Sequence, residues 1–211
     1  TAESALRWKD LQGLNHWKGL LEPLDFDLRK SILRYGELAQ ACYNSFDTDE
    51  HSRYTGTCKF SKDEFFDKAG LVKGKDTGYK VVRYLYACCS IDMPHLAMMY
   101  SRSREPWSKQ SNWIGYVAVS TDEATNTWLG RRDIVVVWRG TIRPLEWIHD
   151  FDFRQADITP LLPRSSIPSR FFKNEDDQPQ VVRGWLALYT SRDPQSGFTT
   201  NSARDQVPCD V

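Results

Sequence analysis

The chain has 211 residues, 40% hydrophobic and 27% charged, and its 28 basic residues balance its 28 acidic ones, giving a formal net charge of zero. This length predicts one domain with a substantial core. The balanced charge argues against a nucleic-acid binder, which needs a basic excess to neutralise phosphates. No apolar run approaches the roughly 18 residues needed to cross a bilayer, so we expect no transmembrane helix, while contact with a membrane surface stays open.

The cysteines are odd in number and show no C-x-x-C spacing: Cys42, Cys58, Cys88, Cys89 and Cys209. This pattern argues against a disulfide framework or a zinc site, so we expect neither a metal nor another cofactor. A hydrolase that uses Cys58 or Cys88 as nucleophile is one alternative, but a catalytic thiol needs a histidine partner. Nothing in the sequence places one of the four histidines beside Cys58, which favours a structural role.

The N-terminal third predicts a strap followed by a long helix. Residues 1–26 lack a helical period, and we expect their apolar side chains to pack as a strap across the body. Asp27 is the expected cap of a helix over residues 28–46. Apolar or aromatic residues recur there at spacings of four and three, which predicts a core-facing side: Leu28, Ile32, Tyr35, Ala39, Cys42 and Phe46.

Three strands are expected, over residues 79–86, 112–120 and 134–138, because β-branched and aromatic residues dominate each of them. Residues 121–130 are expected to be a polar connection, and the strands on either side of it an antiparallel pair. The run Ile134–Trp138 is continuously apolar, which predicts a strand buried on both faces in the middle of a sheet.

This last strand is followed by Arg139, Gly140 and Thr141 and then by an amphipathic stretch that begins after Pro144. Glycine permits a tight backbone turn. In α/β enzymes such a turn, at the carboxyl end of a strand, is where ligands bind, and in α/β-hydrolases a post-strand N–H forms half of the oxyanion hole. An ordinary core strand and turn is the alternative.

Beyond the turn, four prolines and an acidic run predict an irregular insert over residues 156–180. Order is expected to resume at 181–189, and Ser202 to Asp205 has the form of a capping box that opens a helix.

Several segments together resemble the plant branch of the class 3 (fungal-type) lipases, the chloroplast-type phospholipase A1 and galactolipase family. They are the helix 28–46, the run from Trp113 to Ile134, and the pattern W-R-G-T followed by E-W-I-x-D in residues 138–150. The resemblance runs from about residue 7 to residue 206, and it implies that Gly184-Trp185 leads into a helix. It implies an α/β fold, namely an incomplete α/β-hydrolase fold of class 3 lipase type, with N-terminal helices and the first strands of a mixed central sheet. Residues 1–26 would be the strap and 27–211 the N-terminal part of the hydrolase domain.

The resemblance implies a serine carboxylic-ester hydrolase that acts on glycerolipids at a lipid or membrane surface. Thr141 would give its backbone N–H to the oxyanion, with Gly140 shaping the turn, and Arg139 would pair with Asp150 when a lid opens. The residues expected at the lid and substrate are Arg139, Leu145, Trp147, Ile148, Asp150 and Phe151. The alternatives are a simple turn role for Thr141 and a core-facing helix at 145–153, and His149 is disfavoured as general base because it lies on the lid.

No G-x-S-x-G occurs in the sequence, and the family's Ser, Asp and His would all follow residue 206. We therefore expect a truncated chain, inactive alone, in which 208–211 is not family sequence and strand 134–138 presents an unpaired, aggregation-prone edge. The alternative function is a truncated isoform that serves as a non-catalytic lipid-surface or partner-binding module. By resemblance the location is the chloroplast, with a transit peptide outside the chain, and the alternative is the cytoplasm.

Overall fold

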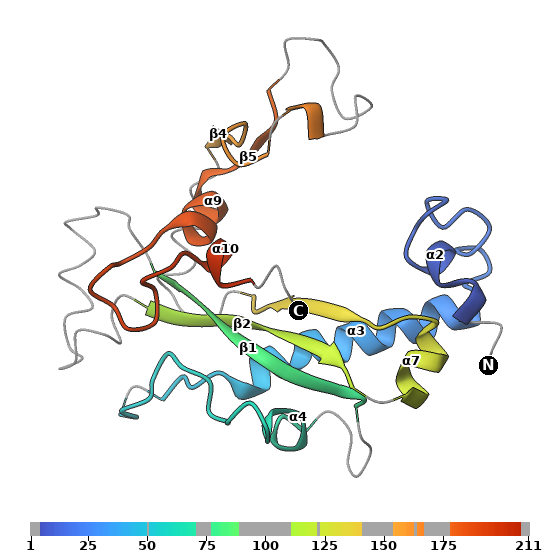
Figure 1. The fold of residues 1–211 in the computed structure, drawn as a ribbon, viewed down its shortest axis with the longest axis horizontal. Helices are drawn as coiled ribbons and strands as arrows, with labels where there is room; N and C mark the ends of the chain where they lie inside the picture. Colours follow the sequence, from blue (N-terminus) through green and yellow to red (C-terminus); the bar gives the residue numbers. More distant parts are fainter. Residues whose placement is uncertain are drawn as a thin grey trace. The chain divides into compact units, whose positions relative to one another are not determined.

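The computed structural model describes residues 5–49, 51–70, 77–88, 111–121, 123–140, 154–162, 164–166 and 178–207. The chain divides into two compact units (Figure 1). The first contains Thr1–Tyr86, Asn112–Gly140 and Gln206–Val211, and the second contains Ala87–Ser111 and Thr141–Asp205.

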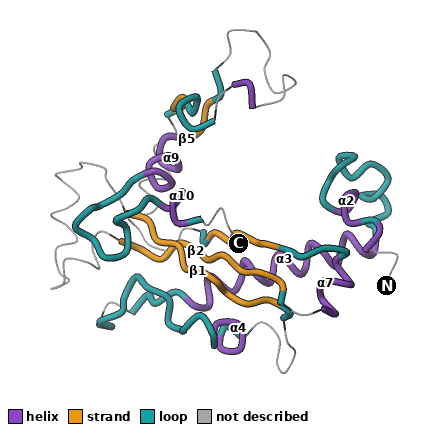
Figure 2. The backbone as a smooth tube through the Cα atoms, in the orientation of Figure 1, coloured by secondary structure: helices purple, strands orange, loops and turns teal. Residues whose placement is uncertain are grey.

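A three-stranded sheet forms the centre of the first unit (orange in Figure 2). Its strands are β1 (Tyr79–Cys88), β2 (Ser111–Ser120) and β3 (Ile134–Trp138), in the order β1-β2-β3. β2 and β3 are antiparallel, with Gly115 opposite Trp138 and Val119 opposite Ile134. The three predicted strands and the predicted antiparallel pair are therefore confirmed.

The position of β3 agrees with the expected unpaired edge and not with a place in the middle of a sheet. Among the described strands it lies at one end of the order, with β2 in the middle. Its side chains alternate: Val135 and Val137 are buried, whereas Ile134 is 48% exposed and Val136 39% exposed. Burial on both faces is thus wrong for β3, because an uninterrupted apolar run reports hydrophobicity and not how many layers cover the strand.

The long helix α3 (Phe26–Ser45) lies along this sheet and contacts β3, which confirms the predicted helix (Figure 1). Its cap is Asp25 and not Asp27. The Asp25 carboxylate accepts hydrogen bonds from the backbone N–H groups of Asp27 at 3.0 Å and Leu28 at 3.1 Å, so Asp27 already belongs to the first turn. The hydrogen bond from Arg7, and then that from Leu28, lowers the pKa of Asp25 below its usual 3.8.

The buried side of α3 is rotated relative to the predicted one. Leu28, Cys42 and the adjoining Phe46 are buried as expected, but Ile32 is 54% exposed. The buried positions of α3 that were not predicted are Leu38 and three small residues, Ser31, Ala41 and Ser45. Small side chains let a helix approach a sheet closely, a preference that a hydrophobic period does not detect.

Aromatic rings fill the core between this helix and the sheet. Phe65, from the short helix α4 (Phe65–Lys68), lies 4.6 Å from Tyr116, 5.9 Å from Tyr84 and 6.1 Å from Trp113, measured between ring centroids. The Tyr116 hydroxyl donates to the Leu38 carbonyl at 2.7 Å. Rings in tilted contact contribute about 0.5–1.5 kcal/mol each beyond their burial, so this cluster fixes β2 against α3.

Two other segments of the first unit depart from the expectations. Around α2 (Trp8–Leu11) the apolar side chains do not pack as a strap: Leu11 is buried, but Leu6 is 86% exposed and Leu14 64% exposed. The expected polar connection contains a helix, α7 (Glu123–Leu129). Its sequence lacks a clear helical period, but Leu129 is buried and the Arg34 guanidinium lies 4.6 Å from the Trp128 ring centroid.

In the second unit β4 (Gln155–Asp157) pairs antiparallel with β5 (Gln180–Val182), so strands flank the predicted insert. A 3₁₀ turn, η1, covers Arg164–Ser166. The predicted helix at Gly184-Trp185 is confirmed as α9 (Arg183–Thr190), which contacts both strands.

The predicted helix after Ser202 is confirmed as α10 (Ala203–Gln206). The Asp205 N–H donates to the Ser202 hydroxyl at 3.2 Å, which in turn donates to the Asp205 carboxylate at 2.7 Å. Within the described ranges, no helix combines the length and apolar character needed to span a bilayer.

Candidate active site at the carboxyl end of strand β3

The described backbone reaches Arg139 and Gly140 just after β3 ends. The other predicted site residues lie outside the described residues: Thr141, Leu145, Trp147, Ile148, Asp150 and Phe151. Their roles in the oxyanion hole and the lid therefore stay predictions, and the geometry of the site begins with the two residues that lead into it.

Arg139 holds the turn against the neighbouring strand. Its backbone N–H donates to the Ile114 carbonyl at 2.7 Å, its Nε donates to the Trp113 carbonyl at 3.0 Å, and its Nη1 donates to the Gly140 carbonyl at 2.8 Å. Arg139 is only 9% exposed. Hydrogen bonds from a charged donor are about twice as strong as neutral ones, so this side chain fixes the Gly140 carbonyl relative to β2.

The same guanidinium lies over an aromatic ring of helix α3. Its Cζ is 3.9 Å from the centroid of Phe46, which is itself 1% exposed. A desolvated cation–π contact of this kind contributes about 2 kcal/mol. Arg139 therefore acts in the structure as a clamp between β2, α3 and the turn, and its expected pairing with Asp150 stays a prediction.

Gly140 is not among the residues with positive φ, so its backbone conformation does not by itself call for glycine. A Cβ atom built on it would collide with the Tyr43 hydroxyl oxygen and lie 3.0 Å from Tyr43 Cζ. A side chain at this position would therefore require the end of the Tyr43 side chain, which is 44% exposed, to shift.

Three residues beside Arg139 and Gly140 were not predicted from the sequence. Tyr43 lies against Gly140, Phe46 contacts the Arg139 guanidinium, and the Trp113 carbonyl accepts a hydrogen bond from Arg139. Tyr43 is 44% exposed, and its hydroxyl makes no hydrogen bond with the described part of the chain. No linear signal marks it, because its contact with Gly140 arises only when α3 packs against β3.

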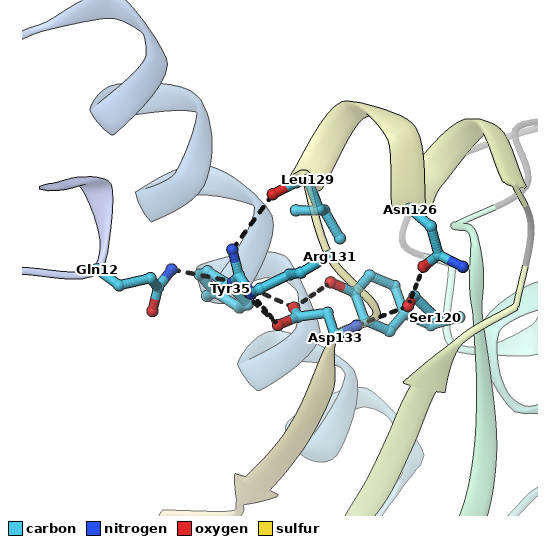
Figure 3. A network of polar contacts seen from close by, with 8 residues as sticks. Gln12, Tyr35, Ser120, Asn126, Leu129, Arg131 and Asp133 are labelled. Carbon is cyan, nitrogen blue, oxygen red and sulfur yellow. Dashed lines mark hydrogen bonds and ion pairs between the residues drawn. The ribbon is translucent and has the colours of Figure 1, made fainter. Parts of the chain in front are cut away.

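The opposite end of β3 carries a dense polar network (Figure 3). The buried Asp133 carboxylate accepts hydrogen bonds from the Tyr79 hydroxyl at 2.6 Å and the Tyr35 hydroxyl at 2.9 Å. Arg131 donates to it from Nε at 3.2 Å and Nη2 at 2.9 Å. The Asp133 N–H donates to the Ser120 hydroxyl at 2.8 Å.

Burial, together with the nearby carboxylate of Asp133, raises the pKa of Tyr35 and Tyr79. Both phenols are therefore neutral donors at physiological pH. With its oxygens satisfied by three side chains, Asp133 serves as a structural anchor and not as an acid or base that meets a ligand.

The thiols show the features of structural cysteines. Cys42, Cys58 and Cys88 are free, and burial raises the pKa of each thiol, that of Cys42 to about 12. A raised pKa keeps sulfur in the unreactive thiol form. Among the residues that the structure describes, no group of three or more His, Cys, Asp or Glu side chains is arranged to hold a metal ion.

Known proteins that are similar to this chain indicate the family to which it is related. No family model matches the chain. It is 46% identical over 208 residues to phospholipase A1-IIgamma of Arabidopsis thaliana, which covers 98% of this chain and 47% of that protein. It is 45% identical over 203 residues to phospholipase A1-II 1 of Oryza sativa subsp. japonica, covering 96% of this chain and 49% of that protein.

A third relative, the phospholipase A1-Igamma1 of Arabidopsis thaliana that is named chloroplastic, is 44% identical over 207 residues, or 97% of this chain and 37% of that protein. The chain thus spans about half the length of the first curated relatives it matches. With identity of this level over nearly all of its residues, the chain is a homologue of the plant phospholipase A1 lipases.

Proposed function

We propose that this chain is part of a glycerolipid acyl-ester hydrolase of the class 3 lipase type, and that it supplies the oxyanion side of a serine-hydrolase site. The observation that carries the proposal is the 46% identity to a phospholipase A1 across 98% of the chain, including the turn after β3. The helices and antiparallel strands of the described residues are compatible with an α/β-hydrolase fold that is completed by further sequence.

Ester hydrolysis places negative charge on the former carbonyl oxygen, so it is accelerated by N–H donors that are already in position. In this proposal the Thr141 N–H is such a donor and Gly140 gives it access. Arg139 donates a hydrogen bond to the Gly140 carbonyl. In this proposal that bond keeps the backbone before Thr141 in place, so that less of it has to reorganise in the transition state. The nucleophilic serine and its His and Asp partners are assigned to sequence outside these 211 residues, which contain no G-x-S-x-G.

The stretch that follows the turn is proposed as the lid. Apolar residues of 145–151 would meet the lipid surface when it opens, and Asp150 would then pair with Arg139. The substrate is accordingly a glycerolipid presented in a membrane or aggregate. The proposed location is the chloroplast, which two of the relatives carry in their names and others do not, with the cytoplasm as the alternative.

The test compares the longest natural product that contains this chain with the 211-residue chain alone. Fatty-acid release from phosphatidylcholine and galactolipid vesicles is measured for both. We expect hydrolysis by the longer protein only, and a loss of about a hundredfold or more in kcat for Thr141→Pro, which removes the proposed donor, but not for Thr141→Val, which keeps it.

Absence of hydrolysis by the longer protein, with vesicle binding retained, would contradict the proposal and favour the non-catalytic lipid-surface module. Equal losses for Thr141→Pro and Thr141→Val would contradict the oxyanion assignment alone. Circular dichroism of each variant separates these outcomes from misfolding.

A further inference from the structure

The exposed side of helix α3 carries large apolar side chains in its first half. Ser31 and Leu38 are buried on the other side of the helix. Four apolar residues of this first half, or of the turn that leads into it, are about half exposed or more: Leu24 46%, Phe26 67%, Ile32 54% and Leu33 57%. We call these four side chains the α3 patch. Apolar side chains that gather on one exposed surface mark an interaction site.

Two basic residues lie within the α3 patch. Arg29 comes three residues before Ile32 and four before Leu33, so it lies between them on the helix surface. The Lys30 Nζ lies 4.3 Å from the centroid of the Phe26 ring. Both basic side chains are exposed, and neither makes an ion pair with the described part of the chain. The patch therefore combines apolar surface with positive charge.

The acidic residues at the start of α3 do not cancel this positive charge. The Arg7 guanidinium lies 2.8 Å from the Asp25 carboxylate and 3.7 Å from the Asp27 carboxylate. Their negative charge is balanced by Arg7 and by the positive end of the helix. The exposed acidic residues Glu22 and Glu37 lie before and after the patch in the sequence. The two basic residues are thus the uncompensated charges within the patch.

The backbone under the α3 patch is held by the fold. The Asp25 carboxylate caps α3, and the Asp25 N–H donates to the Leu20 carbonyl at 2.8 Å, which closes the turn before the helix. The preceding segment is fixed as well, because Leu11 is buried and α2 contacts α3 (Figure 1). The exposed side chains of the patch therefore need no folding step before they meet a partner.

We propose that the α3 patch docks the protein on an anionic glycerolipid membrane. The apolar side chains would enter the boundary between headgroups and acyl chains, and Arg29 and Lys30 would meet the lipid phosphates. The 211 residues have no net charge, so attraction to an anionic surface has to come from a local basic excess of this kind. The choice of a glycerolipid membrane as partner rests on the proposed function, because an ester presented in a membrane is reached by an enzyme that is held at its surface.

The experiment measures the affinity of the longest natural product that contains this chain for vesicles, by sedimentation. One set of vesicles is phosphatidylcholine, and the other contains phosphatidylglycerol as well. We expect Leu33→Gln to weaken binding to both sets by about tenfold, because an apolar side chain no longer leaves water. Arg29→Gln should weaken binding to the anionic vesicles by about fivefold, and binding to phosphatidylcholine by less than about twofold.

A matched control lies elsewhere in the first unit. The Arg53 Cζ is 4.7 Å from the centroid of the Tyr54 ring, and Tyr54 is 54% exposed. This pair repeats the exposed combination of a cation and a ring that Lys30 and Phe26 form, but it lies outside the α3 patch. Arg53→Gln and Tyr54→Gln should therefore leave both affinities unchanged.

Three results would overturn the inference. The first is a wild type that binds neither set of vesicles, and the second is a loss of binding that only follows the fraction of unfolded protein, measured by circular dichroism. The third is a Leu33→Gln variant that is less stable than wild type but binds vesicles equally well, because the rest of the protein or a protein partner then covers this side of α3.

Failure of the inference and failure of the proposed function give different results. Fatty-acid release is measured on the same vesicles. A wild type that binds through the α3 patch but releases no fatty acid refutes the proposed function and leaves the docking surface in place. Fatty-acid release by a wild type whose Leu33→Gln and Arg29→Gln variants bind equally well refutes the docking surface alone.

Discussion

The two ends of strand β3 are held by the same helix in different ways. At its amino end Tyr35 of α3 donates to Asp133, inside a network whose polar atoms satisfy one another. At its carboxyl end Tyr43 of the same helix meets Gly140 by shape alone. The Asp133 carboxylate at the amino end is occupied by three side chains, whereas at the carboxyl end the Tyr43 side chain is 44% exposed and its hydroxyl makes no hydrogen bond with the described part of the chain. The difference teaches that the stability of the strand and its proposed chemistry are located at opposite ends.

The largest expected effect on stability comes from a substitution that disrupts the polar network at the amino end of β3. Asp133→Asn removes the charge that Arg131 and two tyrosines share, and loss of one partner of a buried ion pair costs about 3–5 kcal/mol. We expect a fall of this size in the free energy of unfolding, measured by urea denaturation. Arg132→Gln at the exposed neighbouring position is the control, and it should change the value by less than about 0.5 kcal/mol.

If the two ends of β3 differ as described, the Asp133→Asn molecules that remain folded should hydrolyse substrate with the same kcat as the unmodified full-length protein. A kcat that falls further than the folded fraction would show that the amino end also shapes the site.

Two matched substitutions within β3 should have effects of intermediate size on stability. Val135 is 9% exposed and Val136 39% exposed. Val135→Thr buries a hydroxyl and should cost about 1–3 kcal/mol, whereas Val136→Thr should stay within about 0.5 kcal/mol. Thermal denaturation of both variants provides the comparison, and equal costs would mean that both faces of β3 are covered.

The smallest expected effect is at the start of α3, away from both tyrosines. Asp25→Ala removes the helix cap and should cost about 1 kcal/mol, more than Asp27→Ala, with no effect on kcat. Because the pKa of Asp25 is lowered in the fold, its contribution is fully present above its usual value of 3.8 and is lost as the pH falls below it through the folded pKa.

Denaturation curves of wild type and Asp25→Ala should accordingly differ at pH 6 and converge near pH 2, values chosen about two units on either side of that usual pKa. A difference that persists unchanged at the lower pH would contradict the assignment of the cap to the Asp25 carboxylate.

Elements with strong local patterns were predictable from the sequence, and contacts between distant segments were not. The three strands and the helix α3 follow from β-branched runs and a helical period. The helix α7 was missed because its Thr and Asn residues favour other conformations, and tertiary packing overrides such preferences. The predicted cap of α3 was displaced by two residues because Asp25 and Asp27 both carry a side-chain oxygen that can cap a helix.

At the candidate site the position of the turn was predictable, but its supports were not. Arg-Gly-Thr after an apolar run indicates a functional turn at the end of a strand. The enclosure of Gly140 by Tyr43 and Arg139 depends on how α3 packs on β3, and helical spacing contains no such information. The role of Gly140 in an oxyanion turn stays a prediction, because the residues that follow it lie outside the described ones.

Tyr35 of α3 contacts Asp133 before β3 and Tyr43 of the same helix lies against Gly140 after it, so the helix sets the distance between these two contacts. The eight residues from one tyrosine to the other rise about 12 Å along the helix axis. One inserted residue would turn everything beyond it by about 100° and carry Tyr43 away from Gly140. Insertions and deletions between these two positions should therefore be tolerated less well than substitutions at the exposed residues Gly36, Glu37 and Gln40.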